Sequence, residues 1–418
     1  MKAATVTTRR SPVLGARTST TRSRTRTGTS AFGPPVTIIY DTTGQLRHPG
    51  QATFQMVSSA YLLRRTHSWV WGTASSENQK PRQQLFNHKE VMGKKHKDLF
   101  PRIIETGNLY RAYHKAAKGK LYTGGHLIFK QNLAANIANL RKALASGEYQ
   151  PGNPNLFWVY EPKPREITAM PFMDRVAQHA LCNVIEPIFD QVFLPASHAC
   201  RKGKGTHSAA VAVQAELRRM QSNGVKPWVL KTDFSRYFYS VKRDVLHAEY
   251  RRKLSCQPTL ELLGKIVPAT GVGLPIGNLT SQLSANIYGH IIDRWLAHKV
   301  GITRFFRYMD DIVVLGHSRE ALDMLRMGMQ WFSEATMGMR FSKWSVQPAA
   351  RGINFVGYRI WDTHKLLRRD SVLRAKRKIA RYSRLGLHDQ LNRFLASWMG
   401  HAKWADAHNL MKFIGAAT

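Results

Sequence analysis

Three acidic residues in apolar surroundings are the strongest candidates for chemistry in this chain. Asp310 and Asp311 lie side by side within residues 304–316, between two apolar runs that are typical of buried β-strands. Asp233 ends a third apolar run, Trp-Val-Leu-Lys-Thr-Asp at 228–233. Burying carboxylates in such segments is costly unless a turn opens to solvent or a cation is bound. The pattern therefore predicts either a solvated turn or a metal site.

A hairpin is the simplest arrangement for the acid pair. Placing Tyr308, Met309, Asp310 and Asp311 at its tip brings at least one carboxylate to the exposed side, because side chains alternate along a strand. A carboxylate there can hold a hard cation such as Mg²⁺, which prefers carboxylate and phosphate oxygens. Asp233 strengthens the metal interpretation because it places a second acid at the end of a matching strand. On the residues alone, a plain solvated turn stays open as the alternative.

The charge balance points to a polyanionic partner. The 418-residue chain has 63 Lys and Arg against 26 Asp and Glu, which gives a formal net charge of +37. This excess predicts nucleic acid first and an anionic membrane second, and a generally basic protein is the alternative. No apolar run is long enough to span a bilayer, which weakens the membrane interpretation. Three scattered cysteines are too few for a disulfide framework or a zinc site, so we expect a reducing compartment.

The segments around the three aspartates resemble the first and third palm motifs of reverse transcriptases. Gly-Leu-Pro-Ile-Gly-Asn-Leu-Thr-Ser-Gln at 273–282 resembles the second palm motif, in the variant typical of reverse transcriptases from diversity-generating retroelements. Further segments match that family in order, at 161–167, 174–181, 353–358 and 397–401. The resemblance covers roughly residues 92–418. It implies an α+β right-hand polymerase fold, with fingers, a palm built on an antiparallel sheet with helices, and a helical thumb.

The resemblance also implies a division into subdomains. Fingers with part of the palm are expected at 92–227, the palm with a primer-grip hairpin at 228–362, and a basic helical thumb at 363–418. Residues 1–91 are rich in Thr, Ser and Arg, and we expect them to be largely disordered or translated from a wrongly chosen start codon. No room remains after the thumb for a nuclease domain, so strand removal is expected to come from other proteins.

Residue periodicity predicts individual elements within these subdomains. Apolar residues three and four apart indicate helices, and Ser146-Gly147 followed by prolines ends one of them. The predicted helices are 108–113, 131–144, 174–189, a Met-rich segment at 319–340 and a basic segment at 374–381, with a strand at 157–160. Trp398 and Trp404 are expected to add apolar and stacking surface to the thumb.

For catalysis, the resemblance implies a two-metal site. Asp233 and Asp310 would converge on two Mg²⁺ ions, with Mn²⁺ as a possible substitute, and Asp311 belongs to the same motif. The backbone carbonyl of Phe234 is a further expected metal ligand by analogy with polymerase palms.

The resemblance further implies a set of nucleotide contacts. Lys163 and Arg165 would bind the triphosphate, although their spacing alone favours an ordinary basic turn. Phe238 falls five residues after Asp233, where reverse transcriptases place the bulky side chain that excludes a 2′-hydroxyl; a plain core position is the alternative.

The second palm motif departs from the commonest pattern. Many reverse transcriptases have Gln-Gly and Ser-Pro where this chain has Ile276-Gly277 and Ser281-Gln282. An aliphatic Ile276 cannot donate the hydrogen bond of that Gln. Nucleotide selection is therefore expected to depend more on shape than on polar contacts.

Several residues are expected to contact nucleic acid. A Gly-rich basic loop at 200–207 leads into a helix. The loop and the N-terminus of this helix would together form an anion site for template or substrate phosphate. The helical thumb would grip the duplex backbone through its cations, although a solvated charged face is the alternative. The residues concerned are Arg201, Lys202 and Lys204 in the loop, Tyr308 and Met309 at the acid turn, and Lys376, Arg377 and Lys378 in the thumb.

The resemblance implies an RNA-directed DNA polymerase of a phage or bacterial retroelement, acting in the bacterial cytoplasm. It would copy a template-repeat RNA into cDNA from deoxynucleoside triphosphates, with errors directed to template adenines, alongside a small basic accessory protein. One alternative is a reverse transcriptase from a group II intron, a retron or a defence system. Another is a nucleic-acid-binding protein of the same fold that has lost polymerisation, against which the presence of all three acids argues.

Overall fold

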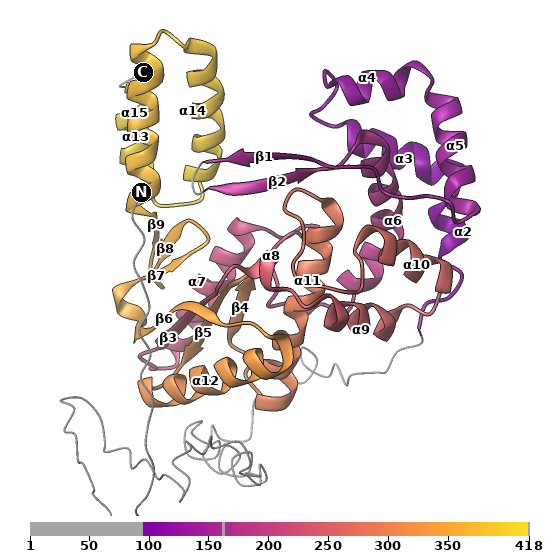
Figure 1. The fold of residues 1–418 in the computed structure, drawn as a ribbon. Coiled ribbons are helices and arrows are strands. Elements are labelled where there is room, and N and C mark those ends of the chain that lie inside the picture. Colours follow the sequence, from indigo (N-terminus) through magenta and orange to yellow (C-terminus); the bar gives the residue numbers. More distant parts are fainter. Residues whose placement is uncertain (1–94, 161–163, 417–418) are drawn as a thin grey trace, which may run out of the picture. The chain divides into compact units, whose positions relative to one another are not determined.

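The computed structural model describes residues 95–160 and 164–416, which combine helices with three antiparallel sheets (Figure 1). This confirms the α+β part of the expected fold class. The expectations for residues 1–91 and for Lys163 lie outside the described residues. Within the described part of the chain, no helix is both long and apolar enough to cross a bilayer.

The N-terminal described region is helical, as the periodicity predicts. Leu109, Ala112, Tyr113 and Ala116 are spaced three and four apart, and all are buried against the long helix α6. Its helices are α2 (Phe100–Ile103), α3 (Thr106–Ala117), α4 (Gly124–Gln131), α5 (Leu133–Ala145) and α6 (Phe172–Asp190). The helices predicted at 108–113, 131–144 and 174–189 are therefore confirmed, as α3, α5 and α6.

A two-stranded hairpin separates α5 from α6. Strand β1 (Asn155–Val159) pairs antiparallel with β2 (Arg165–Ala169), and all five side chains of β1 are exposed. The strand predicted at 157–160 is thus present, beginning two residues earlier. The backbone N–H of Thr168 donates to the carbonyl of Ile276 at 2.8 Å, which fastens β2 to the segment that carries the second palm motif.

The central sheet has four antiparallel strands in the order β4-β5-β3-β6. They are β3 (Trp228–Phe234), β4 (Phe305–Tyr308), β5 (Asp311–Gly316) and β6 (Phe341–Pro348). The predicted strand-turn-strand over 304–316 is confirmed as β4 and β5.

Alternation along the strands gives the central sheet two distinct faces. Leu230, Ile312 and Val314 belong to a core shared with α6 and α11, whereas Val229 and Val313 belong to a second core that includes residues of α7. Helices α7 (Thr206–Ser222) and α12 (Arg319–Phe332) contact strands of the sheet. The other helices of this region are α8 (Tyr237–Ser240), α9 (Arg243–Lys253), α10 (Gln257–Ile266) and α11 (Leu279–Arg294). Burial is deepest in β3 and β5, whereas residues 342–345 of β6 are exposed. Asp233 and Asp311 lie opposite each other at one end of the β3–β5 pair.

The helix predicted over 319–340 is shorter than expected. Helix α12 ends at Phe332 and continues as a π-helical turn, η2 (Ser333–Met337). Gly338 then adopts a φ of +62°, and a Cβ there would overlap the side chain of Lys242. Glycine is needed because the left-handed conformation and the close approach both disfavour a side chain. A similar π-helical turn, η1 (Trp295–Val300), follows α11.

The C-terminal region combines a small sheet with three helices. Its elements are η3 (Ala349–Arg351), β7 (Ile353–Phe355), β8 (Tyr358–Ile360), β9 (Lys365–Leu367), α13 (Arg369–Arg384), α14 (His388–Ala402) and α15 (His408–Ala416). The basic helix predicted at 374–381 is confirmed within α13. Trp404 is 43% exposed, but Trp398 is buried and packs in the second core, so the prediction that Trp398 adds surface is wrong. Its indole is needed to fill the space between the helices.

Candidate active site

The structure brings the three predicted aspartates together at one end of the central sheet. Asp233 on β3 is the register partner of Asp311 on β5, and directly opposed residues of antiparallel strands have neighbouring side chains on one face. Asp310 belongs to the two-residue turn between β4 and β5, and its carbonyl accepts from the Phe234 N–H at 3.3 Å. Ser342 of β6 donates to the carbonyl of Asp233 at 3.1 Å. Ser342 Oγ also donates to Asp233 Oδ2 at 3.5 Å. Sequence reasoning missed Ser342, because a serine 109 residues away in the chain gives no local sign of this contact.

The turn itself is held in a costly conformation. Met309 has a φ of +55°, a left-handed value that a non-glycine residue rarely adopts. Its side chain is only 9% exposed and packs in the main core. Arg307 also donates from Nη1 to the Met309 carbonyl at 3.2 Å. Packing and this hydrogen bond together compensate the backbone strain.

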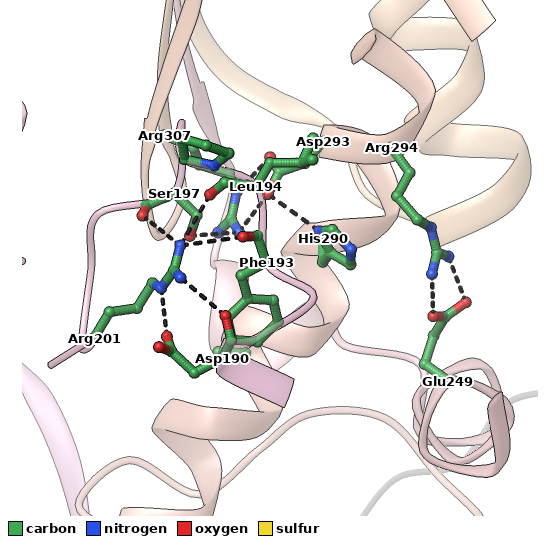
Figure 2. A network of polar contacts seen from close by, with 12 residues as sticks. Asp190, Phe193, Leu194, Ser197, Arg201, Glu249, His290, Asp293, Arg294 and Arg307 are labelled. Atoms are coloured by element: carbon green, nitrogen blue, oxygen red, sulfur yellow. Dashed lines mark hydrogen bonds and ion pairs between the residues drawn. The ribbon is translucent and has the colours of Figure 1, made fainter. Parts of the chain in front are cut away.

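Arg307 forms the centre of a buried network behind the turn, shown in Figure 2. Arg307 and Asp293 of α11 are both fully buried, and Nε and Nη2 donate to the two Asp293 oxygens at 2.7 Å each. Nη2 also donates to Ser197 Oγ at 3.1 Å. Burial alone would raise the pKa of Asp293, but Arg307 and His290 hold it below its ordinary value. The ion pair therefore stays charged, and it anchors β4 to α11.

The Gly-rich basic loop is largely engaged with the chain itself. Arg201 Nε donates to Asp190 Oδ1 at 2.5 Å and its Nη1 to the Leu194 carbonyl at 2.9 Å, contacts that Figure 2 also shows. Lys204 Nζ donates to the Pro195 carbonyl at 2.6 Å, and burial lowers the pKa of Lys204 to about 8. Lys202 is exposed. The phosphate-binding role of this loop stays a prediction, and Lys202 is its best remaining candidate.

Positive charge compensates the carboxylates of the turn only in part. Burial, with a smaller effect of the Asp233 and Asp311 carboxylates, raises the pKa of Asp310 from 3.8 to about 6. Burial likewise raises the pKa of Asp311 to about 6, although Lys231 acts in the opposite direction. Lys231 Nζ donates to Asp311 Oδ2 at 3.0 Å, whereas Asp311 Oδ1 is buried without a hydrogen-bond partner in the described structure.

These features fit a divalent cation. An orphaned carboxylate oxygen and carboxyl groups of raised pKa are what buried metal ligands show before a cation neutralises them. Within residues 95–160 and 164–416, no group of three or more His, Cys, Asp or Glu side chains is arranged to hold a metal ion. Any cation at the turn would therefore need backbone or substrate oxygens besides the aspartates, and the Phe234 carbonyl adjoins Asp233 in the chain.

Ile276 and Gly277, two of the predicted nucleotide-binding residues, belong to the loop at 273–278 that precedes α11. Backbone hydrogen bonds to Phe238 and Thr168 hold this loop in place, and it is called the clamped loop. The Leu274 N–H donates to the Phe238 carbonyl at 2.7 Å, and Phe238 is half-buried on α8 against the main core. Gly277 has a φ of +112°, and a Cβ there would lie 3.1 Å from the Thr168 carbonyl of β2. Only glycine fits this position. Ile276 and Gly277 are thus fixed against β2, the strand that Arg165 opens.

Of the remaining predicted residues, Tyr308 lies beside the turn as the register partner of Asp311, and the others lie on α11 and α13. Gln282 is exposed on α11, and Tyr308 is half-buried at the end of β4. Arg377 is exposed on α13. Lys376 lies 4.7 Å from the ring centroid of Phe413, and Lys378 lies 5.3 Å from that of Phe394, so both aliphatic stems cover aromatic rings of the C-terminal helices.

Comparison with known proteins identifies the central part of the chain. Residues 159–360 match the family model described as "Reverse transcriptase (RNA-dependent DNA polymerase)". The chain carries a reverse transcriptase domain. This domain contains the three aspartates, Phe238 and the whole central sheet. The match together with the antiparallel sheet confirms the expected right-hand polymerase fold.

Relatives of the reverse transcriptase domain include proteins encoded in introns. Protein YkfC of Escherichia coli is 29% identical over 183 residues, which cover 40% of this chain and 47% of YkfC. The group II intron-encoded protein LtrA of Lactococcus lactis is 24% identical over 173 residues, which cover 38% of this chain and 28% of LtrA. The chain thus spans less than half the length of these two relatives. Telomerase from Candida albicans aligns over 56% of this chain and 51% of its own, at 10% identity and a TM-score of 0.40.

We expect removal of one partner of the buried ion pair to destabilise the fold. Asp293→Asn leaves the Arg307 guanidinium buried without its counter-charge, so the free energy of unfolding should fall by about 3–5 kcal/mol. The exposed pair of Arg319 with Asp323 provides the matched control, because Asp323→Asn should cost less than about 1 kcal/mol. Urea unfolding measures both, and equal losses would contradict the anchoring role.

We expect the metal-free protein to be destabilised by its own carboxylates. The pKa of Asp310 is about 6 in the folded chain against 3.8 ordinarily, so ionisation of Asp310 opposes folding above pH 6, and this cost disappears as the pH falls below about 4. At pH 8 without divalent cations, Asp310→Asn should therefore raise the melting temperature, by a stabilisation on the order of 1 kcal/mol. Thermal unfolding from pH 4 to 8 tests this.

Mg²⁺ should then stabilise the native sequence more than the Asp310→Asn variant, because a bound cation offsets the same cost. Melting curves with and without Mg²⁺ at pH 8 compare the two proteins. If Mg²⁺ raises the melting temperature of both proteins equally, Asp310 is not a ligand of the cation.

Proposed function

We propose that this chain is an RNA-directed DNA polymerase that extends a primer on an RNA template by metal-assisted phosphoryl transfer. The observation that carries the proposal is the convergence of Asp233, Asp310 and Asp311 at one end of the central sheet, inside the reverse transcriptase domain. The pKa values of the Asp310 and Asp311 carboxyl groups are raised, as expected for metal ligands in the absence of their cation.

In this proposal each acid has a role that its position supports. Asp233, Asp310 and the Phe234 carbonyl would hold two Mg²⁺ ions, for which Mn²⁺ could substitute. When bound, such ions lower the pKa of the primer 3′-hydroxyl and stabilise the triphosphate and the leaving pyrophosphate. Asp311 lies beside Asp233 across the strand pair and adds negative charge to the site. The clamped turn keeps these carboxylates in place before substrate arrives, which reduces the reorganisation needed for catalysis.

The clamped loop and β2 would form the nucleotide pocket. Arg165, with Lys163, is proposed to bind the triphosphate, and Phe238 to exclude the 2′-hydroxyl. Ile276 and Gly277 lie on the same loop-strand contact as Thr168, which supports their role beside the nucleotide. Gln282 belongs to the same motif. With Ile276 in place of a polar side chain, selection depends on shape.

The subdomains are assigned on the same basis. Residues 92–227 are proposed as fingers with part of the palm, 228–362 as the palm and 363–418 as the thumb. Helix α13 supports the last assignment, because it carries Arg377 among many exposed cations suited to a phosphate backbone. The hairpin of β7 and β8 is proposed as the primer grip.

Within this function we propose the diversity-generating retroelement type, on the sequence of the motif at 273–282. The template would be a template-repeat RNA copied into cDNA with errors at adenines, with a small basic accessory protein as partner, in a bacterial cytoplasm. The relatives favour a second candidate, a group II intron-type enzyme, because LtrA is such an intron-encoded protein. A chain that binds RNA without polymerising it is the third.

Primer extension on an RNA template with Mg²⁺ and deoxynucleotides tests the activity. The Asp310→Ala, Asp311→Ala double variant should lose extension by more than about 10³-fold, because it removes two acids of the metal site. Retention of extension by the double variant would refute the assignment of the site. Sequencing the product separates the two polymerase candidates: errors concentrated opposite adenine support the retroelement type, and uniform accuracy supports the intron type.

Phe238→Ala should admit ribonucleotides. Removing the ring opens space for a 2′-hydroxyl, so the ratio of kcat/KM for ribonucleotides to that for deoxynucleotides should rise about 10-fold or more. Tyr239→Ala is the matched control, since Tyr239 is the next aromatic residue of α8 and is 41% exposed. Single-nucleotide incorporation kinetics measure both variants. If the ratio of kcat/KM values is unchanged in Phe238→Ala, Phe238 packs in the core and does not exclude the 2′-hydroxyl.

A further inference from the structure

Lys231 connects the aspartate turn to a different sheet. Its Nζ donates to Asp311 Oδ2 at 3.0 Å and to the backbone carbonyl of Asn354 on β7 at 2.6 Å. Lys231 lies two residues before Asp233 on β3, so both side chains are on the same face of the central sheet. Its side chain is 26% exposed, so solvent screens these contacts only partly. An ammonium group has three donors and can bond both acceptors at once.

The position of Asp311 depends on this contact. Of its two carboxylate oxygens, Oδ2 accepts from Lys231, whereas Oδ1 is buried and has no hydrogen-bond partner in the described structure. The lysine is thus the cation that orients this carboxylate. The acceptor on the other side, a β7 carbonyl, is fixed by the sheet that β7 forms with β8 and β9.

The small sheet is in turn fixed to helices on either side of it in sequence. Tyr358 of β8 hydrogen-bonds His207 Nδ1 at 2.8 Å and donates to the His401 carbonyl at 3.0 Å. The rings of Tyr358 and His401 stack with centroids 4.6 Å apart, and His207 stacks on Trp404 at 4.7 Å. The β7–β8 hairpin is therefore held by the first turn of α7 and by the last turn of α14.

We propose that Lys231 is a positioning residue, which links the Asp311 carboxylate to the β7–β8 hairpin. The position of the hairpin relative to the central sheet then determines the orientation of the Asp311 carboxylate. The proposal rests on the proposed polymerase function. The proposal explains why a lysine lies in the middle of the largely apolar strand β3, where its two acceptors offset its desolvation. A contiguous set of contacts then runs from His401 through Tyr358, β7 and Lys231 to Asp311.

A double-mutant cycle tests whether Lys231 acts through Asp311. Lys231→Met should lower kcat for primer extension about 10-fold or more and change KM for the deoxynucleotide less than about 3-fold, because orientation is lost and substrate binding is not. Lys231→Arg should recover part of kcat, since a guanidinium can bond a carboxylate and a carbonyl together. Lys231→Met added to Asp311→Asn should cost little beyond Asp311→Asn alone.

Lys226→Met is the matched control, because Lys226 is an exposed lysine just before the opposite end of β3. Its kcat and KM should equal those of the native sequence. Additive losses of Lys231→Met and Asp311→Asn, or a rise in KM with an unchanged kcat, would overturn the proposal.

Hydrogen–deuterium exchange supplies a readout that does not need activity. Lys231→Met should speed amide exchange in residues 353–360 and at the turn of Met309 and Asp310, whereas Lys226→Met should not. If the native sequence fails to extend any primer, the proposed function fails, and the exchange experiment still decides whether Lys231 links the two segments. If amide exchange in residues 353–360 is unchanged, Lys231 does not connect the turn to the β7–β8 hairpin and the proposal is wrong.

Discussion

The geometry of the candidate site depends on the ion pair between Arg307 and Asp293. Burying two charges is costly, and the structure offsets this cost with two 2.7 Å hydrogen bonds and further acceptors at Ser197 and Met309. Gly289 of α11 leaves the space, since a Cβ there would overlap the guanidinium. A single buried side chain thereby fixes β4 to α11 and also holds the strained turn. An apolar replacement could pack, but it could not donate to the Met309 carbonyl.

One end of the β3–β5 strand pair packs in the core, and the other end carries the charged side chains of the candidate site. On one face, Val229 and Val313 pack in the second core, while Lys231, Asp233 and Asp311 continue the same rows toward the turn. The side chains change from apolar to charged within two residues of each strand. The apolar end supplies the burial that stabilises the sheet, and it also makes the neighbouring carboxylates poorly solvated. Stability of the fold and reactivity of the site thus have the same physical source.

Sequence patterns were sufficient where the signal is local. Apolar runs predicted β4 and β5, three-to-four spacing predicted α3 and α5, and the acids beside the apolar runs marked the candidate site. They failed where a partner is a backbone carbonyl or lies far along the chain. Arg201 is conspicuous in a Gly-rich loop, yet it bonds Asp190 and the Leu194 carbonyl. The contact of Lys231 with Asn354 has no sequence signature, because any residue offers the same carbonyl.

The distribution of charge explains how a chain of net charge +37 keeps an acidic site that is only partly compensated. Arg307 pairs with the buried Asp293 and Arg201 with the partly exposed Asp190, and many other cations are exposed on helices such as α13. Lys231 reaches Asp311 but leaves one of its oxygens without a partner. Coulomb attraction to distant surface cations is screened, so it does not replace a ligand at the turn. A basic surface can therefore attract a polyanion while the turn keeps a buried carboxylate oxygen available to the proposed cation.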